Sequence, residues 1–227
     1  MTGICDNLRR IRDEIHQLEA RFGRVPDSVQ LLAVSKTKPV ADLREALACG
    51  QRAFGENYVQ ELEEKQEALA DAGIEWHFIG PLQSNKSRIV AERADWMHSL
   101  DREKIARRLH EQRPAHMAPL NVCLQVNISG EASKSGVTPE ALPALAETIA
   151  GLSALRLRGL MAIPAPSTDF DAQRRVFARV REAQEGLIAR GHTLDTLSMG
   201  MTGDMAAAIA EGATLVRIGT AIFGARG

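Results

Sequence analysis

The sequence has few of the features that mark several large classes of protein. Aromatic residues make up only 4% of its 227 residues, which is low for recognition of partners or nucleic-acid bases through aromatic side chains. Its three cysteines are widely spaced and form no CxxC pair. We therefore expect neither a disulfide framework nor a zinc site, and a reducing cytoplasm fits. The net charge of −1 gives no general attraction to nucleic acid or membrane surfaces.

The sequence also shows no signal peptide and no candidate membrane span. Residues 1–22 carry charges throughout, unlike a signal peptide, and no apolar run approaches the roughly 20 residues of a membrane span. The chain is 44% hydrophobic, enough for one substantial core. We expect residues 1–227 to form a single domain in the cytoplasm, without nucleic-acid or membrane partners.

Hydrophobic periodicity predicts both helices and strands. Near the start, steps of three and four residues predict an amphipathic helix through Ile4, Leu8, Ile11, Ile15 and Leu18 that ends by Gly23 and Pro26. Eight short apolar runs follow as candidate strands: Leu31–Val34, Arg52–Phe54, Glu75–Ile79, Trp96–Ser99, Asn121–Ile128, Arg158–Ile163, Thr196–Ser198 and Leu215–Ile218. Helical patterns separate them; in one, Thr138 is the expected N-cap and Pro139 the first helical residue.

Alternation of strands and helices indicates βαβ units and a parallel sheet. Eight such units predict an α/β fold, a single (β/α)₈ TIM-type barrel with an extra N-terminal helix. The alternative is an open doubly wound sheet, which needs a glycine-rich phosphate loop after its first strand. Residues 35–39 follow that strand and contain no glycine, which favours the barrel.

Active sites of such barrels lie at the carboxyl ends of the strands, so the residues that close each apolar run are the candidates. Lys36 closes the first run, where partial burial favours the neutral amine that attacks an aldehyde. It is a candidate Schiff-base lysine; the alternative is a lysine that extends from the strand end to solvent. Lys38 lies further into the loop and is the weaker candidate.

The seventh and eighth units end in small and hydroxyl residues. Ser198 and Thr202 follow the seventh strand, with Thr202 as the expected cap of the next helix, and Gly219 and Thr220 follow the eighth. Free backbone N–H groups at such turns favour an anion, and barrels of this kind often bind phosphate there. Ordinary capping explains either segment alone, but two neighbouring turns of this type predict a phosphate site.

Three further polar residues lie within or near strand ends. Arg217 in the eighth strand is costly to bury, so it faces a ligand or forms a buried ion pair with Glu56 or Asp204. Asn57 and His77 lie near the ends of the second and third strands. A lone histidine is more often a satisfied core residue than a catalyst.

Two other segments have a functional and an ordinary interpretation. Lys134 lies in a long polar loop after the fifth strand, where it would serve as a lid or transient amine, or simply as a solvated lysine. Residues 102–113 form the one strong basic run, but glutamates interrupt it and no aromatic residue accompanies it. A solvated helix face is the better interpretation than a nucleic-acid site.

Taken together, several blocks resemble one family. AVSKT, FGENYVQE, WHFIGPLQSNK, VNISGEASKSG, GLMAIP, LSMGMTGDM and VRIGTAIFG are similar to the signature blocks of the YggS/PROSC-like pyridoxal 5′-phosphate (PLP) homeostasis proteins. The similarity runs from about Leu31 to Gly224. It implies the barrel of the N-terminal domain of alanine racemase and a PLP cofactor bound as a Schiff base.

The resemblance assigns roles to individual residues. Lys36 would carry the Schiff base and Arg217 would face the pyridine nitrogen. Ser198, Thr202 and the Gly219–Thr220 turn would hold the phosphate, while Asn57, His77 and Met161 would line the ring. One departure is Thr202-Gly203, where relatives often have Ser and a polar residue; threonine keeps the hydroxyl.

A non-catalytic PLP carrier is the expected function, with PLP-dependent apoenzymes as possible acceptors. The alternative is a racemase-like enzyme, which needs a second base; in alanine racemase, the resemblance implies, this is a tyrosine from an extra β domain of a partner subunit. The sequence ends at Gly227, so we expect no such domain and a monomer. Tyr58 is its only tyrosine, in the expected first turn of a helix. A permanently charged Arg217 beside the pyridine nitrogen would also weaken the cofactor as an electron sink.

Overall fold

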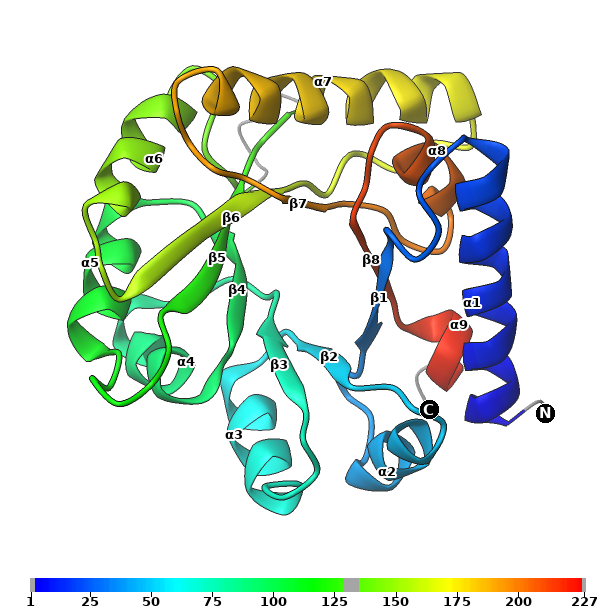
Figure 1. The fold of residues 1–227 in the computed structure, drawn as a ribbon. Helices are drawn as coiled ribbons and strands as arrows, with labels where there is room; N and C mark the ends of the chain where they lie inside the picture. Colours follow the sequence, from blue (N-terminus) through cyan, green and yellow to red (C-terminus); the bar gives the residue numbers. More distant parts are fainter. Residues whose placement is uncertain (1–2, 129–134, 226–227) are drawn as a thin grey trace.

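A closed barrel of parallel strands forms the centre of the molecule (Figure 1). The computed structural model describes residues 3–128 and 135–225. Its eight strands pair in sequence order, and β1 closes the ring against β8. The strands are β1 (Gln30–Val34), β2 (Ala53–Glu56), β3 (Glu75–Phe78), β4 (Trp96–Leu100), β5 (Leu120–Gln125), β6 (Leu155–Met161), β7 (Thr196–Ser198) and β8 (Leu215–Ile218). The predicted (β/α)₈ barrel is confirmed, and the open sheet is excluded.

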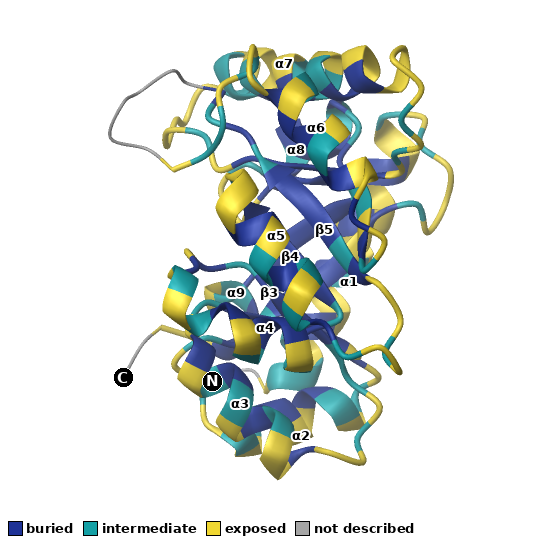
Figure 2. Cartoon of the chain, turned by 90° about the vertical axis from the view of Figure 1, so that its left-hand side faces the viewer, coloured by how far each residue is buried: buried dark blue, intermediate teal, exposed yellow. Residues whose placement is uncertain are grey.

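Helices surround the barrel and cover its outer face (Figure 1). In chain order they are α1 (Ile4–Arg21), α2 (Val40–Ala48), α3 (Val59–Ala68), the 3₁₀ turn η1 (Ser84–Lys86), α4 (Ser87–Arg93), α5 (Glu103–Gln112), α6 (Leu142–Ala150), α7 (Phe170–Ile188), α8 (Met205–Ala210) and α9 (Thr220–Phe223). Figure 2 shows the strands mostly buried, while the helices alternate between buried and exposed faces. This is the amphipathic pattern expected of helices packed on a barrel.

The extra N-terminal helix is present as predicted. In α1, Leu8, Ile11 and Ile15 are at most 3% exposed. The helix packs beside α9, α2 and α8, close to the C-terminal end of the chain (Figure 1). Gly23, in the left-handed region with φ 64°, follows its last turn. Among the described residues, no helix is long and apolar enough to cross a membrane.

Two expectations about local structure are wrong. Thr138 does not cap a helix: its carbonyl accepts from Ala141 and Leu142, so a turn comes first and α6 begins at Leu142 with a proline in its first turn. Thr202 does not cap α8 either, because Asp204 takes that position. The carboxylate of Asp204 accepts from the Met201 backbone at 2.6 Å, which closes the Met201–Asp204 turn before the helix starts.

No disulfide framework was expected, but two of the three cysteines are bonded to each other. A disulfide joins Cys5, in the first turn of α1, to Cys49, which caps the end of α2, with a Cα–Cα distance of 5.5 Å. The two residues are separated by 44 positions, so only the packing of α1 against α2 brings them together. Cys123 is a free, buried thiol, and burial raises its pKa to about 12.

Candidate functional site

The carboxyl ends of all eight strands meet at one end of the barrel, which we call the mouth. Lys36 comes two residues after β1 and is half-buried there. Asn57 follows β2, Gln125 ends β5, Ala162 follows β6 and Gly219 follows β8. Because side chains alternate along a strand, Leu32 and Leu215 point inward with the interior cluster, as do residues two positions further on. Arg217 therefore belongs to the inner face, while Lys36 lies in the turn that follows β1 at the mouth.

Arg217 is held below the mouth by neutral acceptors. One nitrogen donates to the Ser198 carbonyl at 2.6 Å and to its hydroxyl at 2.8 Å, and another donates to the Ala162 carbonyl at 2.9 Å. The suggested ion pair with Glu56 is wrong, because Glu56 pairs with Lys65. Burial lowers the pKa of Arg217 to about 10, with Asp204 acting in the opposite direction, so the guanidinium stays charged at neutral pH.

Ser198 ends β7 and is fully buried. Its hydroxyl accepts from Arg217 and lies 2.7 Å from Nδ1 of His98. These contacts use the hydroxyl within the protein, so its predicted contact with a phosphate stays a prediction. Thr202 and Thr220, by contrast, are exposed at the same end of the barrel.

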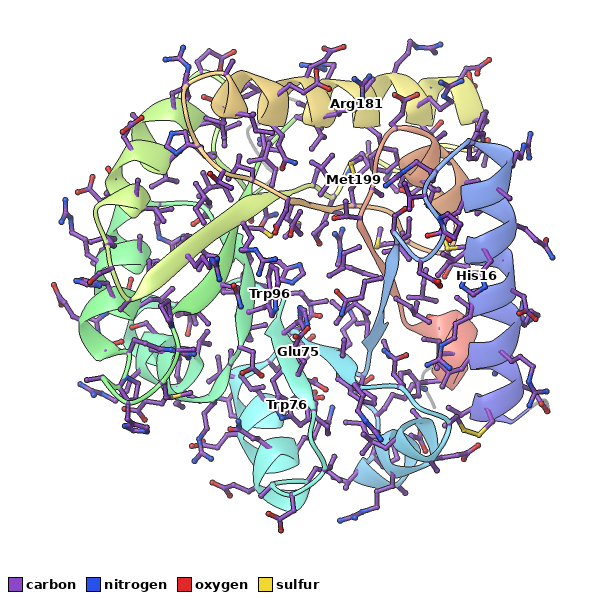
Figure 3. All side chains as sticks on the ribbon, viewed as in Figure 1. His16, Glu75, Trp76, Trp96, Arg181 and Met199 are labelled. Atoms are coloured by element: carbon purple, nitrogen blue, oxygen red, sulfur yellow. A yellow bond between two sulfur atoms is a disulfide. The ribbon has the colours of Figure 1, made fainter. Side chains whose placement is uncertain are left out.

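A line of hydrogen-bonded groups crosses the barrel interior beneath Arg217. His98 Nε2 lies 2.8 Å from Nδ1 of His77, and His77 Nε2 lies 2.6 Å from a Glu75 oxygen. His77 stacks on Trp96 with ring centroids 5.4 Å apart, and Figure 3 places Trp96 and Glu75 inside the ring of strands. Burial, His77 and Arg217 together lower the pKa of His98 well below its usual value, so His98 is neutral. The structure thus gives His77 a full set of core contacts.

Met161 and Asn57 differ in their surroundings. Met161 ends β6, is fully buried and packs with Trp96 and Cys123 in the interior. Asn57 is half-buried, and its buried Oδ1 has no hydrogen-bond partner in the part of the chain that the structure describes. An amide oxygen left unpaired at the mouth is a feature that a bound polar molecule would satisfy.

Two glycines allow the backbone to approach closely at the mouth. A Cβ at Gly219 would lie 3.1 Å from the Val34 carbonyl oxygen, where β1 and β8 run side by side. A Cβ at Gly80 would lie 2.0 Å from the Asn57 carbonyl oxygen, so no larger residue fits there. The Gly219–Thr220 turn, which begins α9, is where sequence reasoning expected the phosphate.

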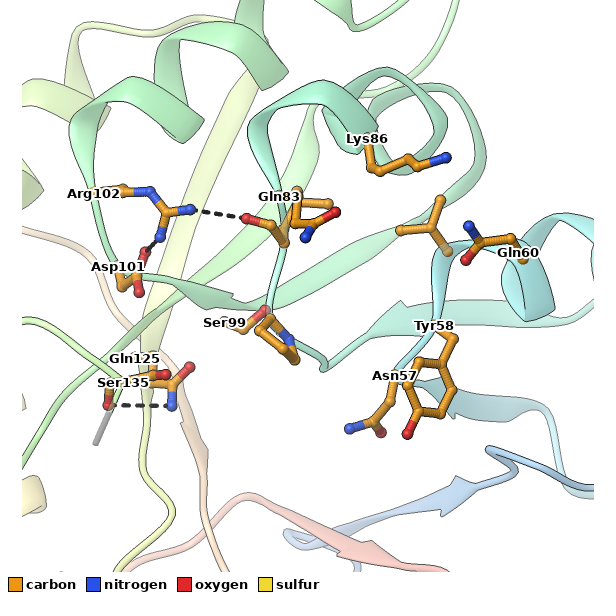
Figure 4. Close-up of a pocket in the computed structure, with 13 residues that line it drawn as sticks. Asn57, Tyr58, Gln60, Gln83, Lys86, Ser99, Asp101, Arg102, Gln125 and Ser135 are labelled. Atoms are coloured by element: carbon orange, nitrogen blue, oxygen red, sulfur yellow. Dashed lines mark hydrogen bonds and ion pairs between the residues drawn. The ribbon is translucent and has the colours of Figure 1, made fainter. Parts of the chain in front are cut away.

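A groove of about 410 Å³ opens beside Asn57 at the ends of β2 to β5 (Figure 4). Its polar lining includes Asn57, Tyr58, Gln60, Gln83, Lys86 and Gln125. Arg102 at its edge bonds Asp101 at 2.7 Å and the Leu82 carbonyl at 2.9 Å. Tyr58 is the N-cap of α3 rather than part of its first turn, and it is half exposed.

The remaining lysine candidates are placed differently. Lys38 Nζ donates to the carbonyls of Phe223 and Ala225 at 3.2 and 2.9 Å, so it ties the loop after β1 to the end of the chain. Lys134 lies outside the described residues. Lys36 makes no hydrogen bond or ion pair to any residue that the structure describes, which leaves its amine available at the mouth.

Sequence reasoning missed an ionic cluster beneath Lys36. Lys65 of α3 contacts Glu56 at 2.8 Å and Glu61 at 2.7 Å, and it also donates to the Ser35 carbonyl at 2.8 Å. Burial raises the pKa of Glu56 to about 7, and Lys65 and Ser35 offset only part of that rise. The sequence held one sign of this cluster: Glu61 and Lys65 are four residues apart on an expected helix, a spacing at which opposite charges form an ion pair.

Comparison with known proteins decides the family. The model for the N-terminal domain of alanine racemase matches residues 7–227. The pyridoxal phosphate homeostasis protein of Pseudomonas aeruginosa is 60% identical over 226 residues, covering 100% of this chain and 97% of that protein. The Escherichia coli K12 protein of the same name is 56% identical over 229 residues, covering 100% and 98%. This chain belongs to the pyridoxal phosphate homeostasis protein family.

A solved structure of a relative agrees with this membership. PipY of Synechococcus elongatus, determined with PLP bound, is 38% identical, with a TM-score of 0.85 and coverage of 98% of this chain and all of that one. The resemblance identified from the signature blocks is therefore confirmed. Lys36, Asn57, His77, Met161, Ser198, Thr202, Arg217, Gly219 and Thr220 remain predicted cofactor contacts.

Proposed function

We propose that this protein binds PLP at the mouth of the barrel, as a Schiff base on Lys36, and takes part in intracellular PLP homeostasis by buffering or delivering the cofactor. The observation that carries the proposal is the amine of Lys36, which stands without a partner among the described residues at the mouth, in the turn after β1, the strand that pairs with β8 and its Arg217. When bound, PLP supplies an aldehyde that an amine captures reversibly.

The residues at the mouth fit such a group. Arg217 carries a fixed positive charge beside the predicted ring site, and the unpaired Asn57 oxygen offers a polar contact at its edge. Gly219 lets the start of α9 pack closely against Val34 at the end of β1, which sets the Gly219–Thr220 turn beside the turn that carries Lys36. Thr202 and Thr220 add exposed hydroxyls on neighbouring strand ends for a phosphate.

A carrier role, rather than catalysis, is supported by the relatives' names and by the chemistry of the mouth. Tyr58, the only tyrosine, caps α3 and is 51% exposed at the groove, so it lacks the enclosed setting of a racemase base. The charged Arg217 would keep the pyridine nitrogen unprotonated. The alternative, a racemase-like enzyme, requires measurable exchange of the α-proton of alanine with PLP bound.

We further infer that PLP-dependent apoenzymes are the acceptors and that the protein acts as a cytoplasmic monomer. The open groove beside Asn57 gives an acceptor access to the mouth. A nucleic-acid partner has no support from α5, because Arg107 bonds Glu103 at 2.6 Å and Arg113 is buried against the carbonyls of Ala91 and Ala94.

The direct test compares the wild type with Lys36→Ala in a PLP titration followed by absorbance. We expect an imine band that saturates with the wild type and is absent with Lys36→Ala, while both proteins unfold at the same temperature. Lys38→Ala is the matched control and should keep the band. An unchanged band in Lys36→Ala would place the Schiff base elsewhere.

A further inference from the structure

The loop that carries Lys36 rests on a buried ion cluster that makes no predicted contact with PLP. We define this cluster as Glu56, Glu61 and Lys65. The side chain of Glu56 is fully buried and that of Lys65 is 6% exposed, while that of Glu61 is 24% exposed. The cluster lies between the end of β2 and the first two turns of α3.

Lys65 uses all three of its N–H groups in this cluster. They donate to a Glu56 oxygen, a Glu61 oxygen and the Ser35 carbonyl, all within 2.8 Å. Burying such charges costs several kcal/mol each, and a well-packed apolar group in their place is often at least as stable. Stability alone therefore does not account for the cluster.

The cluster holds the two residues on either side of Lys36. The Ser35 hydroxyl donates to Glu56 at 2.5 Å, and the Ser35 carbonyl accepts from Lys65. The Thr37 backbone N–H donates to Glu61 at 2.7 Å. Thr37 adopts the left-handed region with φ 62°, a conformation that costs a non-glycine residue on the order of 1 kcal/mol and needs support from its surroundings.

We propose that Lys65, together with Glu56 and Glu61, is a positioning group that fixes the turn around Lys36 and so presents its amine to the PLP aldehyde. The proposal rests on the proposed function, since it concerns the same lysine. None of the three residues touches the cofactor in this account; they act through Ser35 and Thr37. Loss of the cluster would remove the contacts that hold Ser35 and Thr37, so the turn that carries Lys36 would be less well positioned.

Misplacement of a reacting group by about 1 Å can cost up to about 100-fold in rate. We therefore expect the rate of imine formation to fall on the order of 10-fold to 100-fold when the support of Thr37 is removed. The apparent pKa of the imine should also change, because the position of Lys36 relative to Arg217 sets its electrostatic surroundings. A role confined to stability would alter neither quantity.

The experiment uses the full chain and measures the rate of imine formation with PLP, the pH titration of the imine band and the unfolding temperature. Glu61→Ala removes the acceptor for Thr37 but leaves the buried Lys65–Glu56 pair. Glu61→Gln keeps a carbonyl oxygen in the same place, so it should restore most of the wild-type rate. Lys65→Met removes the central cation, and Lys104→Met, at an exposed site on α5, is the control.

The proposal predicts slow imine formation and a shifted pH profile for Glu61→Ala and Lys65→Met, with wild-type behaviour for Lys104→Met. It is overturned if Glu61→Ala forms the imine at the wild-type rate with an unchanged pH profile. If Lys65→Met does not fold, the contrast between Glu61→Ala and Glu61→Gln decides alone. Failure of the wild type to form an imine on Lys36 would instead refute the proposed function, before any cluster variant is compared.

Discussion

Replacement of Glu56 by glutamine changes how stability depends on pH in a way that follows from its burial. Burial raises the pKa of Glu56 from 4.5 to about 7; Lys65 and Ser35 favour the charged form, and Glu61 opposes it. In the unfolded chain the same carboxyl titrates near its usual value. Between these two pH values the folded protein holds a proton that the unfolded chain releases.

The raised pKa of Glu56 makes the folded protein less stable as the pH rises. An acid whose pKa is raised on folding contributes stability that is full below the unfolded pKa and is lost as the pH rises through the folded value. For Glu56 the loss falls between pH 4.5 and about 7, and it amounts to about 3 kcal/mol at about 1.4 kcal/mol per pH unit. Glu56→Gln keeps the shape and does not titrate, so it should gain about that much over the wild type across this window.

The assay is urea unfolding of wild type, Glu56→Gln and Glu64→Gln, with no PLP added, at several pH values from about 4 to about 8. Glu64 is exposed on the same helix and serves as the matched control. Subtracting the free energy of unfolding of the wild type from that of each variant at the same pH cancels the contributions of the other titrating groups. A difference in the free energy of unfolding that is the same at every pH would refute the reasoning.

Three further predictions follow from the site and the fold. Ser198→Ala combined with Thr202→Ala should weaken PLP far more than pyridoxal in equilibrium titrations, because only PLP has the phosphate; equal losses would remove these residues from the phosphate site. Reduction of the Cys5–Cys49 disulfide should lower the free energy of unfolding by about 2–4 kcal/mol, since it closes a long loop, and an unchanged urea midpoint would contradict this. Leu8→Ala, at a fully buried position of α1, should cost about 2–5 kcal/mol in urea unfolding, whereas an effect well below 1 kcal/mol would show that α1 is not part of the core.

The fold was predictable because short apolar runs and helical patterns alternate along the sequence, and each can be recognised from neighbouring residues alone. The short strands Thr196–Ser198 and Leu215–Ile218 have the predicted bounds, although the first is too short to be identified alone. The start of β6 was missed: it begins at Leu155, where Arg156 and Arg158 interrupt the apolar run. Arg158 is tolerated there because it pairs with Asp195 at 2.7 Å and lies over the Trp96 ring.

The site was predictable only where one residue marks the end of a strand. Lys36 closes an apolar run, so its place at the mouth follows from the barrel. The partners of a side chain depend on packing between elements, which sequence does not show. The pairing of Glu56 with Lys65, the contact of Ser198 with His98 and the disulfide all join different elements, and each was missed for this reason.

The central claim is that Lys36 holds PLP, and borohydride reduction of the PLP-loaded protein followed by peptide mapping tests it most directly. Reduction makes the linkage permanent, so the modified residue can be identified. The account predicts loss of the imine band and a single pyridoxyl label on Lys36. A label spread over Lys38, Lys134 and surface lysines, or no label, would contradict it.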